Sequence, residues 1–459
     1  MCFSHGARMA FERVSRVASI PAMVLTAVLT VVSALPAAAV SLLRDPDIEH
    51  ALRQIASPVL RASGLSQSRT HILLVDDPAF NAFVLDNQAI FLNYGLILKV
   101  DSAGMLQAVI AHEAAHITNG HLARRTANLQ SARTAAGLGL ALAALAAAAG
   151  GGEAAGGIAI GTQSAAQRVF LSHTRAEEAS ADRSAASYLT SAGVSPQALV
   201  DLHQAFAGQE VLSVSRQDPY TRSHPLTRDR LRAAQAYVAA HGGKETANPD
   251  TAYWFARARG KVSAFTRSPK WTLRRVAEEK YKDVRLMREA VAHHRQGKFE
   301  KSISALNKAL ALRPNDPFYL ELKGQIYMEN RRWNEALNAY GQAVSQAPQN
   351  AQILSGYGRA QLAAGQPKSA IQTLEKARSR DWRDARLLRD MSVAYAKTGQ
   401  SGMAAVVTAE RYALQGRLND AGLHAKRASA LLPRGSAAWR RAQDVLIASE
   451  RFAKGKKKR

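Results

Sequence analysis

Apolar and polar positions follow two different periods along the first half of the chain. Residues 41–65 place apolar side chains at the three- and four-residue spacing of a helix that buries one side. Residues 71–97 carry apolar, β-branched and aromatic runs broken by Asp-Asp-Pro and Leu-Asp-Asn, which predicts two strands and a turn. The helical period returns from about residue 102. The first half is therefore expected to form an α+β domain.

The second half repeats one pattern at a spacing of 34 residues. Phe299 and Trp333, Pro314 and Pro348, Gly324 and Gly358, and the series Ala309, Ala343 and Ala377 all share this spacing. The period, with small residues at helix contacts and proline at the repeat end, resembles the tetratricopeptide repeat. Such helix pairs stack into a superhelix with a concave face. The pattern restarts out of phase after about residue 400, and a plain helical bundle is the alternative for this half.

The N-terminus has the pattern of a secretory signal peptide over residues 1–39. Arginines precede a long apolar run that ends in small residues, with Ala37 and Ala39 at the positions of an A-x-A cleavage site. Cleavage near Ala39 predicts export to the periplasm and removes Cys2, the only cysteine, so the exported chain would have no disulfide. An uncleaved membrane anchor is the alternative, because the apolar run is nearly long enough to span a bilayer.

The formal net charge of +25 predicts attraction to polyanions. No motif of a nucleic-acid-binding fold is present, so we expect acidic polypeptides or an anionic membrane surface rather than nucleic acid. Residues 135–161 are almost wholly Ala, Gly and Leu. Because alanine is weakly hydrophobic and Glu153 interrupts the run, a small-residue helical hairpin is favoured over a membrane span. This hairpin could act as a lid or make peripheral membrane contact.

The candidate chemistry lies in the pattern H-E-x-x-H at His112, Glu113 and His116. Positions four apart on a helix lie one turn above each other, so both imidazoles project from one face and can hold one zinc ion. Glu113 can then take a proton from the attacking water as a general base. His121 is nine residues from His112, which puts it on the opposite face, as a surface or second-layer histidine.

A catalytic zinc ion needs a third protein ligand. The pattern HExxHxxGxxH is excluded, because positions 119 and 122 are Asn and Leu. Glu178 and Asp182 share a helical face further along, so Glu178 could bind zinc while Asp182 orients a ligand histidine. Glu177 is rotated by about 100° and would face elsewhere. The alternative is an ordinary solvated charged helix.

These motifs resemble those of the zincin metallopeptidases of the CAAX prenyl protease and HtpX type. In that group H-E-x-x-H is followed by E-x-x-A-D, here Glu178, Ala181 and Asp182, with the first Glu as ligand. Many members carry a second Glu two residues later, where this chain has Ser180. The resemblance also implies that His224, in a His-Pro pair followed by Arg230, lies near the metal, where it stabilises the tetrahedral intermediate or caps zinc in a latent state. The alternative for His224 is a histidine in a turn at the start of a helix.

We therefore expect a mainly α chain: an α+β zincin metalloprotease domain followed by an α-helical tetratricopeptide-repeat solenoid. The expected segments are a signal peptide (1–39), a zinc metallopeptidase domain (40–265), a linker (266–283) and repeats with a basic C-terminal tail (284–459). We expect one Zn²⁺ per chain, held by His112, His116 and Glu178, with Glu113, His224, Asp182 and Arg230 completing the catalytic site.

The expected function is degradation of misfolded or stalled proteins in the periplasm. The repeats would bind extended polypeptides, and the resemblance implies outer-membrane β-barrel precursors and their assembly machinery as substrate and partner. By the same likeness, the segment with Asn81, Ala82 and Phe83 lies near the cleft, where an edge strand can pair with an extended substrate. The alternatives are a non-enzymatic holdase or assembly scaffold with a capped zinc site, and a membrane-embedded protease that uses residues 135–161 as a span.

Overall fold

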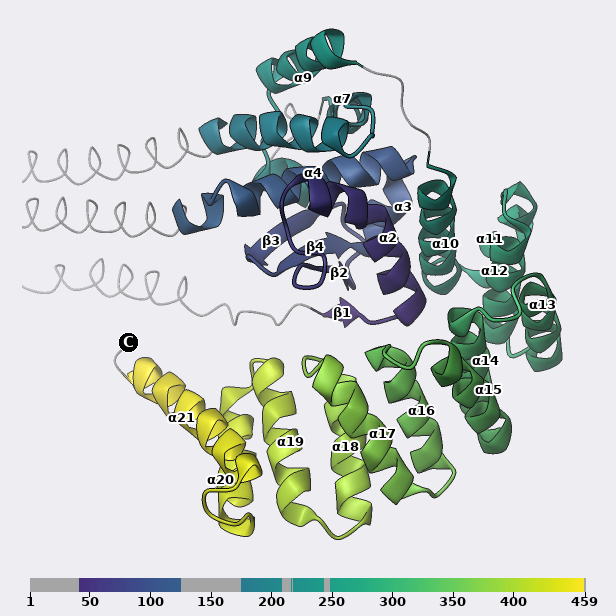
Figure 1. Cartoon of the computed structure of the whole chain (residues 1–459), viewed down its shortest axis with the longest axis vertical. Coiled ribbons are helices and arrows are strands. Elements are labelled where there is room, and N and C mark those ends of the chain that lie inside the picture. Colours follow the sequence, from purple (N-terminus) through teal and green to yellow (C-terminus); the bar gives the residue numbers. More distant parts are fainter. Residues whose placement is uncertain (1–40, 125–174, 209–215, 217, 243–247, 458–459) are drawn as a thin grey trace, which may run out of the picture.

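The computed structural model describes residues 41–124, 175–208, 216, 218–242 and 248–457 (Figure 1). The predicted signal peptide and the Ala/Gly-rich residues 135–161 lie outside this part of the chain. The described residues form a small α+β part followed by a curved array of stacked helices, as the sequence predicted. Among them, no helix combines the length and the apolar character that a membrane crossing requires.

A four-stranded sheet forms one layer of the α+β part. Its strands are β1 (Leu42–Leu43), β2 (His71–Val75), β3 (Ala82–Asp86) and β4 (Ala89–Asn93), in the order β1-β2-β4-β3. Strands β2 and β4 are parallel, and the other pairs are antiparallel. The prediction of two strands over residues 71–97 was wrong, because Leu-Asp-Asn ends β3 and leads into a two-residue hairpin turn, residues 87–88, that connects it to β4. The Asp86 carboxylate accepts from the backbone N–H of Gln88 at 2.7 Å and of Ala89 at 3.0 Å, which closes that turn.

Helices cover the sheet and share its hydrophobic core. They are α2 (Pro46–Ala62), α3 (Tyr94–Lys99), α4 (Ala103–Thr118), an unlabelled helix over residues 175–191, α7 (Gln197–Ala205), α8 (Pro219–Ser223) and α9 (Arg228–His241). Helix α4 packs against α2, α7, β3 and β4, which explains why its residues from Met105 to Ile117 are buried on every side. Ser102 caps this helix by accepting from the backbone N–H of Met105 at 3.1 Å. The H-E-x-x-H segment is thus part of a rigid central helix.

The second half consists of antiparallel helices stacked side by side. They are α10 (Pro249–Thr266), α11 (Pro269–Arg275), η2 (Val276–Glu278), α12 (Lys282–Arg295), α13 (Phe299–Leu312), α14 (Pro317–Glu329), α15 (Trp333–Gln346), α16 (Ala351–Ala363), α17 (Pro367–Arg380), α18 (Ala385–Lys397), α19 (Ser401–Leu414), α20 (Leu418–Leu431) and α21 (Ala437–Lys457). The expected linker, residues 266–283, contains α11 and η2, and its boundaries stay a prediction.

The repeated small residues lie where neighbouring helices approach most closely. Ala309, Ala343 and Ala377 are fully buried. A Cβ added to Gly324 of α14 would lie 2.6 Å from the ring of Tyr340 in α15. One added to Gly358 of α16 would lie 2.6 Å from Leu374 of α17. The 34-residue spacing therefore reflects a repeated contact inside each helix pair.

The array curves back beneath the α+β part and contacts it at several points (Figure 1). Arg257 of α10 is fully buried and donates both to Asp47 of α2 at 2.7 Å and to Asp316, the N-cap of α14, at 2.6 and 2.8 Å. Further along the array, Asp381 accepts from Arg44, next to β1, at 2.5 Å. Buried and half-buried ion pairs thus fix the repeats against the domain that carries the candidate site.

Candidate metal centre

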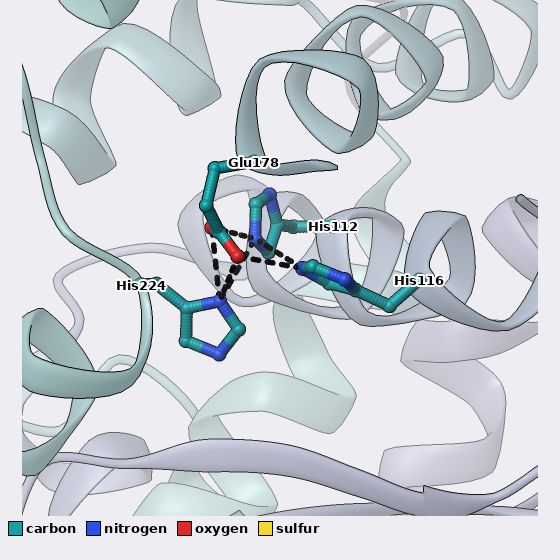
Figure 2. Close-up of side chains that lie close together, drawn as sticks. All are labelled: His112, His116, Glu178 and His224. Carbon is teal, nitrogen blue, oxygen red and sulfur yellow. Dashed lines mark hydrogen bonds and ion pairs between the residues drawn. The ribbon is translucent and has the colours of Figure 1, made fainter. Parts of the chain in front are cut away.

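Four side chains from three segments converge beneath the surface of the α+β part. His112 and His116 come from α4, Glu178 comes from the helix over residues 175–191, and His224 is the C-cap residue of α8 (Figure 2). One nitrogen or oxygen atom from each of the four lies within 4.8 Å of all the others, and all four side chains are buried. The sequence predicted three of these residues as ligands and placed the fourth nearby.

The two α4 histidines point to the same place because they are one helical turn apart. Their Nε2 atoms are 3.0 Å from each other. The Glu178 carboxylate faces both, with Oε2 at 3.2 Å from His112 Nε2 and Oε1 at 3.4 Å from His116 Nε2. Two imidazole nitrogens and a carboxylate that converge in a buried site form a donor set suited to zinc. The residues present therefore fit the predicted metal ion.

The electrostatics of the cluster favour positive charge. Burial opposes protonation of His112, but hydrogen bonds and charge from Asp182 and Glu178 prevail and raise its pKa to about 9. Burial likewise opposes ionisation of Glu178, but His224 and His112 hold the pKa of that carboxyl well below its usual value. The ionised Glu178 and Asp182 carboxylates therefore favour a positive charge at this centre, and a bound cation would take the place of the proton on His112.

Asp182 and Arg230 support the cluster from behind. Asp182 Oδ1 accepts from Nδ1 of His112 at 3.0 Å, which directs the Nε2 atom of that ring towards the centre. Arg230 donates to both oxygens of Asp182, at 2.6 and 2.8 Å, and to the backbone carbonyl of Pro225 at 2.8 Å. Although burial opposes ionisation, Arg230 and His112 hold the pKa of Asp182 well below its usual value. Arg230 thereby joins the Asp182 carboxylate to the segment that carries His224.

His224 and Glu113 lie next to each other at the other side of the cluster. Nδ1 of His224 is 3.0 Å from Glu178 Oε2, and its Nε2 is 3.4 Å from Glu113 Oε1. Glu113 is fully buried, so in this structure the candidate base and the candidate ligands are all shielded from solvent. His224 thus contacts both the candidate base and the candidate ligand Glu178.

His121 departs from the position predicted from the sequence, whereas Glu177 faces away from the cluster as predicted. Helix α4 ends at Thr118, and Gly120 has a positive φ of 67°, so the chain turns before His121. The expectation that His121 lies on the opposite face was therefore wrong: it is buried, and its Nδ1 is 2.9 Å from Nδ1 of His116. It is the second-layer histidine of the two alternatives. Glu177 lies outside the cluster, 3.9 Å from Arg124 Nε.

Two further buried residues were not singled out from the sequence. The ring of Tyr220 in α8 lies 4.7 Å from that of His224, and burial together with the Glu113 charge raises the pKa of Tyr220 well above its usual value. His203 of α7 places Nε2 at 3.4 Å from Asp182 Oδ2. Neither belongs to a spaced motif, so only the packing of α7 and α8 onto the site reveals them.

Known proteins share both halves of this architecture. Residues 44–238 match the sequence pattern of peptidase family M48, and residues 286–316 and 327–399 match tetratricopeptide repeats. The chain is 25% identical over 388 residues to the β-barrel assembly-enhancing protease of Escherichia coli strain K12, which covers 83% of this chain and 78% of that protein. The protein of the same name from Yersinia pestis is 25% identical over 395 residues, covering 84% and 79% of the two chains. A crystal structure of MamA aligns with 37% of this chain and 97% of its own, at 18% identity and a TM-score of 0.28.

Proposed function

Because residues 44–238 form a domain of peptidase family M48, followed by tetratricopeptide repeats, we propose that this chain is an exported zinc endopeptidase that degrades misfolded or stalled proteins. The observation that carries the proposal is the buried convergence of His112, His116 and Glu178, with Glu113 on the same helix as the two histidines. The names of the relatives support outer-membrane β-barrel precursors as substrates and their assembly machinery as a partner of the repeats.

In this proposal His112, His116 and Glu178 hold the metal ion, and the remaining polar groups handle protons and orientation. A bound zinc ion polarises the scissile carbonyl and makes water more acidic. Glu113 takes the proton of the attacking water and passes it to the leaving nitrogen. Asp182 keeps His112 in the orientation that presents Nε2, and Arg230 keeps Asp182 in place.

His224 has two candidate roles, and the structure bears on both. Its contacts with Glu178 and Glu113 support a role in which it stabilises the tetrahedral intermediate once substrate is bound. The same contacts, with the whole cluster buried, also support a resting state in which His224 caps the site. Replacing His224 with Ala distinguishes them: loss of a cap raises casein cleavage, whereas loss of a catalytic group lowers it.

The edge strand β3 is the proposed binding site for the substrate backbone. Among the described residues it pairs with β4 on one side, and it packs on α4, the helix that carries the two candidate histidine ligands. Phe83 stacks on Phe91 at 5.1 Å between ring centroids, and Leu85 is 55% exposed. An extended polypeptide could add to this edge through main-chain hydrogen bonds, which would make cleavage only weakly selective for sequence.

The variant Glu113→Gln tests the proposal. It removes the base and leaves the ligands in place, so casein cleavage should fall by about 10²–10⁴-fold while the metal content stays that of the parent. The matched control is Glu335→Gln, at an exposed side chain of α15, which should cleave like the parent. Cleavage by Glu113→Gln at the parental rate would contradict the proposal.

The alternative function is a non-enzymatic holdase or scaffold with a capped zinc site, and the observation that favours it is the contact of buried His224 with Glu178 and Glu113. If Glu113→Gln loses cleavage but still restores growth to cells that lack the gene, the result favours the scaffold function over the peptidase function. Periplasmic location is part of the proposal and rests on the signal-peptide pattern of residues 1–39. Release of the chain with the periplasmic fraction, and into the soluble fraction at alkaline pH, would support it against a membrane anchor or span.

A further inference from the structure

The last two helices of the array expose an unusual number of large apolar side chains. Of the eight large hydrophobic residues that are exposed in the described part of the chain, four lie on α20 and α21. Leu423 is 71% exposed, Leu431 is 51% exposed and Ile447 is 44% exposed. The final helices of a solenoid usually present a polar outer face, because no further repeat covers them. The end of this array departs from that rule.

Basic residues are interleaved with these apolar ones at helical spacing. On α20, Leu423, Arg427 and Leu431 are four residues apart and form one stripe, with exposed Lys426 beside it. On α21, Ile447 is followed at the same spacing by exposed Arg451, and Lys454 lies one further turn along. Each helix, at the C-terminal end of the array in Figure 1, thus carries an exposed stripe that combines aliphatic and cationic side chains.

The charge around these helices is strongly one-sided. Residues 411–459 contain 13 Lys or Arg and 3 Asp or Glu, a net charge of +10, whereas the whole chain carries +25. Much of the excess positive charge therefore lies in about a tenth of the sequence. A partner for this end of the molecule must present an extended negatively charged surface to the basic residues. It must also have an apolar layer below that surface to bury the exposed aliphatic side chains.

We propose that α20 and α21 bind the surface of a membrane that contains anionic phospholipids. Amphipathic helices that combine exposed Leu or Ile with Lys and Arg are suited to this surface, because the cations meet the headgroups while the aliphatic side chains enter the acyl boundary. Nucleic acid offers no apolar environment in which the exposed leucines could be buried. An acidic polypeptide could bury them only if it also had a matching apolar face. The surface acts independently of the peptidase chemistry and would hold the repeats against a membrane.

The test is sedimentation of the full chain with vesicles of phosphatidylcholine alone and with vesicles that also contain phosphatidylglycerol. Binding should occur only to the second kind. The variant Lys426→Glu/Arg427→Glu should weaken that binding by about 25-fold or more, since each basic residue near an anionic surface contributes about five-fold. The variant Leu423→Ser/Leu431→Ser should remove the part of the binding that persists at high salt.

Matched controls come from α13, at the other end of the array. Lys301→Glu/Lys308→Glu makes the same charge change at two exposed lysines, and Leu312→Ser changes a leucine that is 48% exposed. Both controls should bind vesicles like the parent. Equal binding to both kinds of vesicle, or equal weakening by the α13 charge variant, would overturn the proposal. A combination of two other results would also overturn the proposal. In it, the α20 charge variant loses binding to polyglutamate or DNA, and Leu423→Ser/Leu431→Ser binds vesicles as well as the parent does.

Discussion

Replacing Arg257 with Met tests how firmly the repeats are joined to the peptidase domain. The Arg257 guanidinium is fully buried, and it donates to Asp47 at 2.7 Å, to Asp316 at 2.6 and 2.8 Å and to the Tyr253 hydroxyl at 2.9 Å. Methionine fills much of the same volume but leaves two carboxylates without their main partner. Truncating one member of a buried ion pair costs about 3–5 kcal/mol.

The residual partners decide where in that range the effect falls. Asp47 keeps Lys261, whose Nζ is 3.5 Å away, and Asp316 keeps the backbone N–H groups of Phe318 and Tyr319 at 3.0 Å. We therefore expect a loss of about 3 kcal/mol in the free energy of unfolding, at the lower end of the range. Urea unfolding followed by far-ultraviolet circular dichroism measures it.

The matched control is Arg232→Met, which removes an Arg from an exposed pair with Asp229, where the two side chains are 75% and 90% exposed. That variant should lose less than about 1 kcal/mol. A rescue variant that adds Asp47→Asn and Asp316→Asn to Arg257→Met should recover part of the loss, because it removes the unpaired charges. An Arg257→Met protein within about 1 kcal/mol of the parent would refute the reasoning.

Three other predictions follow from particular contacts. Asp182→Asn should weaken zinc binding by about 10–100-fold, since Asp182 orients His112, and competition with a chromophoric chelator measures this loss. Gly324→Ala should lower the free energy of unfolding by about 1–3 kcal/mol, because its Cβ would meet the Tyr340 ring at 2.6 Å; an unchanged urea midpoint would contradict the helix contact. Burial raises the pKa of Glu321 to about 7, against the attraction of Lys261. Because this folded-state pKa exceeds the unfolded one, the stabilisation that Glu321 contributes is complete below the unfolded pKa and is lost as the pH rises through about 7. Stability should therefore fall between about pH 5 and pH 8 more steeply in the parent than in Glu321→Gln, by an amount on the order of 1–3 kcal/mol, and equal slopes would show that Glu321 ionises normally.

The parts of the fold that depend on local periodicity could be predicted from the sequence. The 34-residue spacing of Ala309, Ala343 and Ala377 gave the repeats, and each of these residues is buried in a helix contact. The pairing of His112 with His116 follows from the helical repeat alone. Glu178 and Asp182 were found because a zinc site needs a third ligand and an orienting carboxylate, and the structure brings both to His112.

The parts that depend on distant contacts could not be predicted in this way. His121 was assigned to the wrong face because extrapolation along α4 ignored the turn at Asn119 and Gly120. Arg257 looks like any charged residue on a helix, since its partners Asp47 and Asp316 are 210 and 59 residues away in the sequence. Tyr220 and His203 join the site only through the packing of α7 and α8. The roles proposed for the site residues and the domain boundaries stay predictions.

Metal analysis of the purified exported chain tests the central claim most directly. The parent should contain one zinc ion per chain, His116→Ala and Glu178→Ala should each lose it, and Glu335→Gln should keep it. Full zinc occupancy in Glu178→Ala, or a parent that binds no zinc when it is supplied, would contradict a centre built from two histidines of α4 and one carboxylate of the helix over residues 175–191.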